Sequence, residues 1–96
     1  MNEIIKALAL SQRAMLILGE ELDRQSRAER TVGTTAQLEA CKQQLVGMVA
    51  QLESGHLPRK EQRLCGMGHM IADSWPVDSK LGEALLLAEQ AYRSVP

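Results

Sequence analysis

The sequence predicts an all-α protein, a small antiparallel bundle of four helices that forms a single domain over residues 1–96. Apolar residues recur at spacings of three and four along most of the chain, which is the periodicity of a helix with one buried face. No run of four or more residues alternates convincingly enough to form a strand. Phe is absent and Trp75 and Tyr92 are the only aromatic residues, so Leu, Ile, Val, Met and Ala must build a core, which suits helix packing.

The first predicted helix runs from the start of the chain to about Arg30. Its inward stripe repeats at spacings of four and three residues, as in a heptad pattern, and has one polar member. Beyond Leu22 the stripe is lost, so we expect 23–30 to be a solvated helix end, followed by a break at Gly33. The stripe consists of Ile4, Leu8, Ser11, Met15, Leu18 and Leu22.

The second predicted helix begins at Thr34 or Thr35 and ends at about Ser54. Thr34 and Gln37 have the spacing of a capping box, in which each side chain bonds a free backbone N–H. Gly55 can adopt the left-handed conformation that ends many helices. The predicted inward residues are Leu38, Cys41, Leu45, Met48 and Leu52.

A third helix is predicted over 58–74, with Pro58 in its first position and Pro76 just beyond its end. Gly66 and Gly68 each cost about 1 kcal/mol in a helix relative to Ala. We therefore expect a neighbouring helix to approach the backbone closely there; a break in the helix is the alternative. The predicted inward residues are Leu64, Met67, Ile71 and Trp75.

The fourth predicted helix starts after a cap at Asp78 or Ser79. Four helices with short connections favour an up-down-up-down bundle, in which the first two form a long hairpin and the two shorter ones pack across one face of it. A three-helix variant follows if the third helix breaks at its glycines. The inward residues of the fourth helix are Leu81, Leu85, Ala88, Tyr92 and Val95.

The charge and the cysteine content limit the classes of function that the sequence allows. The net charge of −1 is evenly spread along the chain, which argues against a tail that binds polyanions. No apolar run exceeds five residues, the length of those at 14–18 and 84–88, which is far short of a membrane span. No secretory signal is evident and there are only two cysteines, Cys41 and Cys65, so we expect a cytoplasmic protein with reduced thiols.

The first and fourth helices carry more apolar side chains than one inward stripe requires. A wide core-facing arc is one explanation, and a second interface with a partner protein or a second copy is the other. We predict a non-enzymatic protein-binding module that blocks, bridges or chaperones another protein, as an inhibitor, an immunity-type protein, an anti-defence factor or a chaperone would. A homodimer is the form in which a second copy would cover the surplus apolar surface. The residues expected to bind the partner are Leu10, Ile17, Met70, Trp75, Leu86 and Leu87.

A small dimeric regulator that binds nucleic acid is the alternative function. It would use two basic groups that the bundle places at opposite ends, unless a dimer brings them together. Stacking aromatic side chains, which such proteins commonly use, are scarce. The two groups are Arg24, Arg27, Arg30 and Arg59, Lys60, Arg63.

A third hypothesis is a thiol or metal sensor at Cys65 and His69. On a continuous helix Glu61, Cys65, His69 and Asp73 recur every four residues and form one stripe. One helix cannot enclose an ion, however, and no second ligand pair is present. We therefore predict no metal, no cofactor and no catalytic residues, since no phosphate loop or nucleophile motif occurs either.

Overall fold

The computed structural model describes residues 2–63, 66–76 and 78–96 and confirms an all-α fold with four helices. No strand occurs within these ranges. None of the helices in them is long and apolar enough to cross a membrane. The elements are α1 (Glu3–Ser26), α2 (Thr35–Ser54), a single 3₁₀ turn η1 (Lys60–Gln62), α3 (Met67–Ser74) and α4 (Lys80–Ser94).

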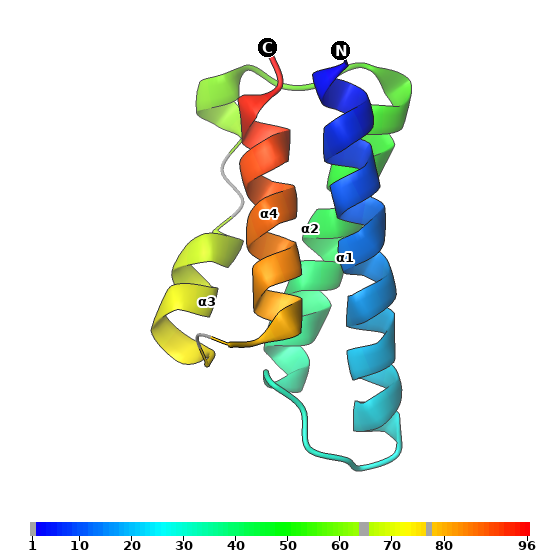
Figure 1. Cartoon of the computed structure of the whole chain (residues 1–96), viewed down its shortest axis with the longest axis vertical. Coiled ribbons are helices and arrows are strands. Elements are labelled where there is room, and N and C mark those ends of the chain that lie inside the picture. Colours follow the sequence, from blue (N-terminus) through cyan, green and yellow to red (C-terminus); the bar gives the residue numbers. More distant parts are fainter. Residues whose placement is uncertain (1, 64–65, 77) are drawn as a thin grey trace.

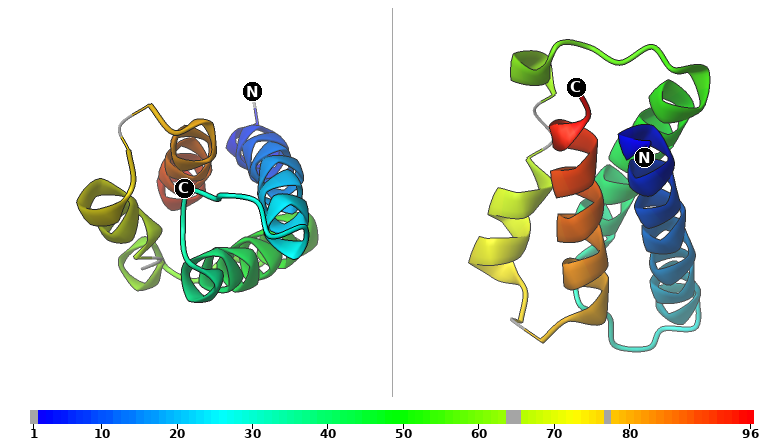
Figure 2. Two further views of the ribbon diagram at one scale, coloured as in Figure 1. Left: turned by 90° about the horizontal axis from the view of Figure 1, so that it is seen from below. Right: turned by 45° about the horizontal axis from the view of Figure 1, so that its top comes forward.

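The chain alternates in direction, and α1 is the helix against which both α2 and α4 pack. The short helix α3 packs on α4 instead (Figure 1). Figure 2 shows α3 on the side of α4 that faces away from α1. The prediction that the two shorter helices would lie together across the first hairpin is therefore wrong for α3. The molecule measures 40 × 23 × 21 Å.

The core confirms the predicted inward faces of α2 and α4, whose ten residues are all buried. On α1 the predicted stripe is rotated, because only Ser11 and Leu18 of its members are fully buried. Ala7 and Ala14 lie at the centre of the face, where small side chains let α4 and α2 approach the α1 backbone closely. The other stripe members lie on the shoulders of this face, half-buried against the core: Ile4, Leu8, Met15 and Leu22.

The helix ends agree in part with the prediction. Thr34 and Gln37 form the expected capping box, with the Gln37 amide accepting a hydrogen bond from the Thr34 N–H at 3.0 Å. Gly55 is left-handed, and of the two candidate caps for α4 it is Ser79 that bonds the Gly82 N–H. The α1 helix ends at Ser26 rather than near Arg30.

The segment predicted as one helix over 58–74 is instead divided into η1 and α3. Gly66 causes the break: it has a φ of +78° and forms the N-cap of α3. No other part of the chain lies within 4 Å of the position of an added Cβ, so the predicted close approach is wrong at Gly66. At Gly68 the predicted close approach is confirmed, since an added Cβ would lie 3.4 Å from a carboxylate oxygen of Glu89 on α4. Met67, Ile71 and Trp75 are buried as predicted, whereas Leu64 lies outside the described residues.

Candidate interaction groove

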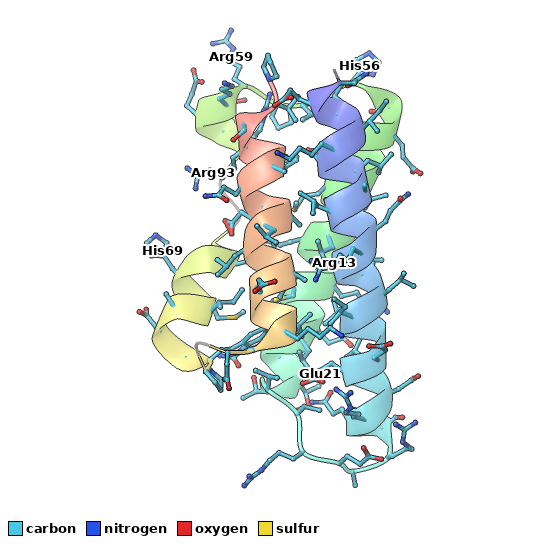
Figure 3. All side chains as sticks on the ribbon, viewed as in Figure 1. Arg13, Glu21, His56, Arg59, His69 and Arg93 are labelled. Atoms are coloured by element: carbon cyan, nitrogen blue, oxygen red, sulfur yellow. The ribbon has the colours of Figure 1, made fainter. Side chains whose placement is uncertain are left out.

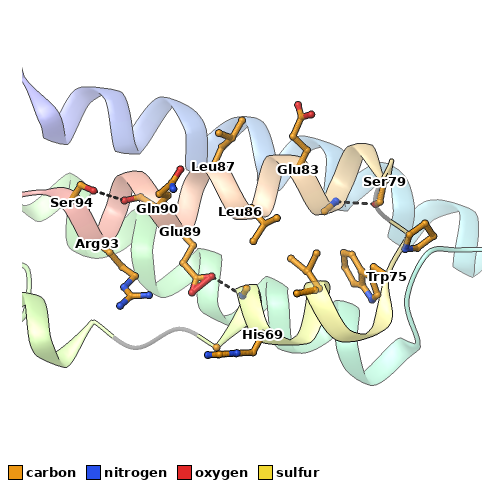
Figure 4. Close-up of a pocket in the computed structure, with 16 residues that line it drawn as sticks. His69, Trp75, Ser79, Glu83, Leu86, Leu87, Glu89, Gln90, Arg93 and Ser94 are labelled. Atoms are coloured by element: carbon orange, nitrogen blue, oxygen red, sulfur yellow. Dashed lines mark hydrogen bonds between the residues drawn. The ribbon is translucent and has the colours of Figure 1, made fainter.

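An open groove of about 1370 Å³ runs between α3 and α4 on the side of the molecule away from α2 and α1 (Figure 4). Apolar side chains of both helices line it, together with the charged side chains Glu83, Glu89 and Arg93 of α4. The lining includes Ile71, Ala72, Trp75 and Pro76 from the α3 side, and Gly82, Glu83, Leu86, Leu87, Glu89, Gln90 and Arg93 from α4.

Two leucines of α4 are the exposed apolar groups of this groove. Leu86 is 42% exposed and Leu87 is 37% exposed, although both are large side chains on a helix whose other leucines are buried. In Figure 4 Leu86 points toward the α3 side, whereas Leu87 points the other way, over the flank of α4 nearer to α1. Exposed leucines beside a preformed concavity are the usual elements of a site that receives an apolar side chain of a partner.

A buried carboxylate fixes α3 against α4. Glu89 is 6% exposed, and one of its carboxylate oxygens accepts a hydrogen bond from the Gly68 N–H at 2.8 Å. Gly68 is in the first turn of α3, where a negative charge is stabilised by free N–H groups and by the helix dipole. The Glu89 carboxylate of α4 therefore caps the first turn of α3, the helix that forms the opposite wall of the groove.

The far end of α3 is held by Trp75. Its indole N–H donates to the Gln37 side chain at 3.1 Å, and its ring lies against Gly33, where an added Cβ would be only 2.8 Å away. Ile71 packs in the same way on Gly82 of α4, at 3.2 Å from the position of an added Cβ. Contacts at both ends thus order an eight-residue helix that would not be stable by itself.

The predicted partner-binding residues do not form one surface. Leu86, Leu87 and Trp75 line the groove, but Trp75 is 6% exposed and its side chain belongs mainly to the core. The remaining three are half-buried and pack against the core: Leu10, Ile17 and Met70.

The predicted basic groups also stay apart. Arg59 lies at the top of the molecule in Figure 3, and Glu21, which pairs with Arg24, lies toward the bottom. Arg27 pairs with Glu29 at 2.9 Å. Arg30 and Lys60 are exposed at the two ends.

Arg63, in the connection that precedes α3, stabilises the C-terminal end of α4. It is 4% exposed, and its guanidinium donates to the carbonyls of Pro58, Tyr92 and Val95. It also lies 5.9 Å from the centre of the Tyr92 ring. These contacts hold the chain between α2 and α3 against the last turn of α4, and they commit the Nε and one terminal nitrogen of Arg63 to backbone carbonyls.

The proposed thiol or metal stripe is not assembled on one helix. Cys65 lies outside the described residues, Glu61 is in η1, and His69 and Asp73 are exposed on α3, which begins only at Met67. No three His, Cys, Asp or Glu side chains cluster as metal ligands within the described ranges. Burial, together with the negative charge of Glu89, raises the pKa of the Cys41 thiol to about 11, which keeps it protonated and unreactive at neutral pH.

Comparison with family models and with curated proteins gave no match for this chain. The chain is therefore described by its fold and its groove. It is a small helical bundle whose α3 and α4 enclose an open, mainly apolar groove.

Proposed function

We propose that this chain is a small non-enzymatic protein-binding module that receives a segment of a partner protein in the groove between α3 and α4. Binding there would act sterically, by blocking, bridging or chaperoning the partner. The observation that carries the proposal is the exposure of Leu86 toward the α3 side of a groove of about 1370 Å³, which the exposed Leu87 borders from the other flank of α4.

The form of the groove supports a helical or extended peptide segment as the bound element. Amphipathic helices bind such grooves by inserting apolar side chains spaced three and four residues apart. The hydrogen bonds at Gly68 and Trp75 hold α3 in place, so little ordering would be needed when the partner binds. A prearranged apolar wall beside a polar rim is typical of the central residues of a protein interface.

The experiment immobilises the wild-type chain or a Leu86→Glu variant and compares the proteins that each captures from a nuclease-treated lysate of the source organism. The captured material is washed at low and at high salt. We expect the wild type to retain a protein at both salt concentrations and Leu86→Glu to lose it, because a carboxylate would be buried against apolar side chains. Val46→Glu is the matched control, since Val46 is equally exposed on α2 but does not line the groove.

Two results would contradict the proposal. Capture that is equal for wild type and Leu86→Glu would show that the groove is not the binding site. Capture that disappears with nuclease or at high salt would favour the nucleic-acid regulator, because phosphate contacts weaken steeply as salt is added.

A further inference from the structure

The groove between α3 and α4 has opposite charges at its two ends. Glu83 lies in the first turn of α4 and Arg93 in its last turn, and both are exposed and line the groove. They are ten residues apart, which is about 15 Å along the helix axis. Arg59 is exposed beyond Arg93 at the same end of the molecule (Figure 3). At the other end Asp78 is exposed as well, beside a single cation, Lys80.

The two charges that line the groove are not neutralised from within the described part of the chain. The ion pairs found there lie in the last turns of α1 and just after it, so Glu83 and Arg93 are without an ionic partner. Glu89 precedes Arg93 by one turn, but it is 6% exposed and its carboxylate accepts the Gly68 N–H. Both exposed charges can therefore pair with groups of a bound molecule.

Leu86 lies between these charges on one strip of α4. The strip consists of Glu83, Leu86, Gln90 and Arg93, whose spacings of three, four and three residues keep them within about 80° of the helix surface. Leu86 is 42% exposed and points toward the α3 side (Figure 4). The strip thus presents a carboxylate, an apolar side chain, an amide and a guanidinium in this order.

We propose that the segment bound in this groove is an amphipathic helix that runs antiparallel to α4, with an acidic residue near its N-terminus and a basic residue near its C-terminus. The inference rests on the proposed function, since it gives the chemistry of the partner of the same groove. Any helix is stabilised by acidic residues in its first turn and basic residues in its last. Such a helix brings its acid to Arg93 and its base to Glu83 only when it runs antiparallel to α4.

The spacing of residues in the partner follows from the spacing on α4. Its acidic residue lies opposite Arg93, an apolar residue seven positions later lies opposite Leu86, and a basic residue three positions further lies opposite Glu83. Exposed charge pairs add little affinity, but they select the partner and its direction. The apolar residue on Leu86 supplies most of the affinity.

A second copy of α4 fits this strip less well than such a helix. The α4 helix has the same order of charges. However, the antiparallel register that brings Glu83 to Arg93 of the second copy places Leu86 opposite Gln90 in both halves. Each exposed leucine then faces an amide instead of an apolar side chain, so a helix with an apolar residue at this position is the better match.

The test uses a displayed library of helical peptides of about 16 residues, or about 24 Å of helix, in which the positions on one face are randomised. Selection on the wild-type chain at low salt should enrich the predicted order of acid, apolar residue and base. Selection on Arg93→Glu should replace the acid by Lys or Arg, and selection on Leu86→Glu should enrich no such peptide. Arg13→Glu is the matched control, since Arg13 is exposed on α1 and does not line the groove.

A selected peptide that carries a fluorophore then measures the size of the effect. Arg93→Glu should weaken its binding about five-fold at low salt, and replacing the acid of the peptide by Lys should restore the affinity. Arg13→Glu should leave the affinity unchanged. At about 1 M salt the difference between wild type and Arg93→Glu should shrink, because exposed charges are screened.

Three outcomes overturn the inference, and they separate it from the proposed function. Enriched peptides with an apolar residue but no charge preference, or with a preference that Arg93→Glu leaves unchanged, would refute the charge-matched helix while the groove remains the binding site. No enrichment on the wild type would refute both proposals. A wild-type dimer in sedimentation equilibrium that Leu86→Glu dissociates would show that a second copy fills the groove.

Discussion

Replacing Arg63 by Ala tests the contact that joins the connection before α3 to the end of α4. The guanidinium donates to three backbone carbonyls from a nearly fully buried position, at 2.7 Å to Pro58 and 3.2 Å to Tyr92 and with a further bond to Val95. The last carbonyls of a helix have no partner inside the helix, so Arg63 satisfies groups that would otherwise be buried unpaired.

The magnitude follows from these bonds. A hydrogen bond from a charged donor contributes about 1.5–3 kcal/mol, and the cost of burying the guanidinium offsets part of the total from three bonds. We therefore expect Arg63→Ala to lower the free energy of unfolding by about 3 kcal/mol. For a domain of this size the melting temperature should fall by about 15 °C. Arg63→Lys should lose about half as much, because an ammonium lacks the planar fork that reaches several carbonyls.

Urea unfolding followed by circular dichroism at 222 nm measures this directly, with the slope of the transition checked for constancy. Arg59→Ala is the matched control, since Arg59 is exposed four residues earlier and should change stability by less than about 0.5 kcal/mol. If Arg63→Ala were as stable as the control, the buried guanidinium would not be holding the end of α4, and the reasoning would be refuted.

Three further predictions concern the supports of the groove and the buried thiol. Glu89→Ala should lower the free energy of unfolding by about 2 kcal/mol because the Gly68 N–H loses its acceptor, whereas Glu89→Gln, which keeps an acceptor oxygen, should lose less in the same urea titration. Gly33→Ala should cost about 1–3 kcal/mol because its Cβ would lie 2.8 Å from the Trp75 ring, and a shift in Trp fluorescence should accompany the loss. The pKa of the Cys41 thiol rises from 9.0 to about 11 in the folded chain, so the stability linked to this group is intact below about pH 9 and is lost as pH rises through 11. Unfolding free energies measured from pH 8 to pH 11 should therefore fall more for the wild type than for Cys41→Ala, and parallel curves would contradict the burial of this thiol.

The repeating apolar pattern predicted the elements that are regular. The buried faces of α2 and α4, the capping box at Thr34 and the left-handed Gly55 all follow from local spacing or local backbone preference. These features depend on residues within one or two turns of one another, and the sequence displays such relations directly. The exposed Leu86 and Leu87 were likewise expected from an apolar excess on one helix.

The errors arose where distant segments decide the structure. The stripe on α1 was rotated because helices pack on both of its shoulders, so its narrow centre is filled by Ala7 and Ala14 rather than by the larger residues. The sequence held a signal of the true buried face: Ala7, Ala14 and Glu21 are spaced seven residues apart and therefore share one face of α1. The helix predicted over 58–74 failed because Gly66 is left-handed and α3 depends on a carboxylate from α4 for its first turn.

Four buried or half-buried polar side chains give the irregular parts of this chain their shape. Glu21 accepts the Val32 N–H in the connection between α1 and α2, and Gln37 accepts the Trp75 indole N–H after α3. Arg63 joins the connection before α3 to the end of α4, and Glu89 joins α4 to the first turn of α3. Each of these bonds joins residues at least eleven apart in sequence, so none strengthens a helix by itself; each fixes one element relative to another. The groove is consequently set by the same contacts that stabilise the fold. Substitutions at Glu89 or Gly33 should therefore weaken partner binding together with the stability they remove, whereas Leu86→Glu should abolish binding by placing a carboxylate on the groove wall itself.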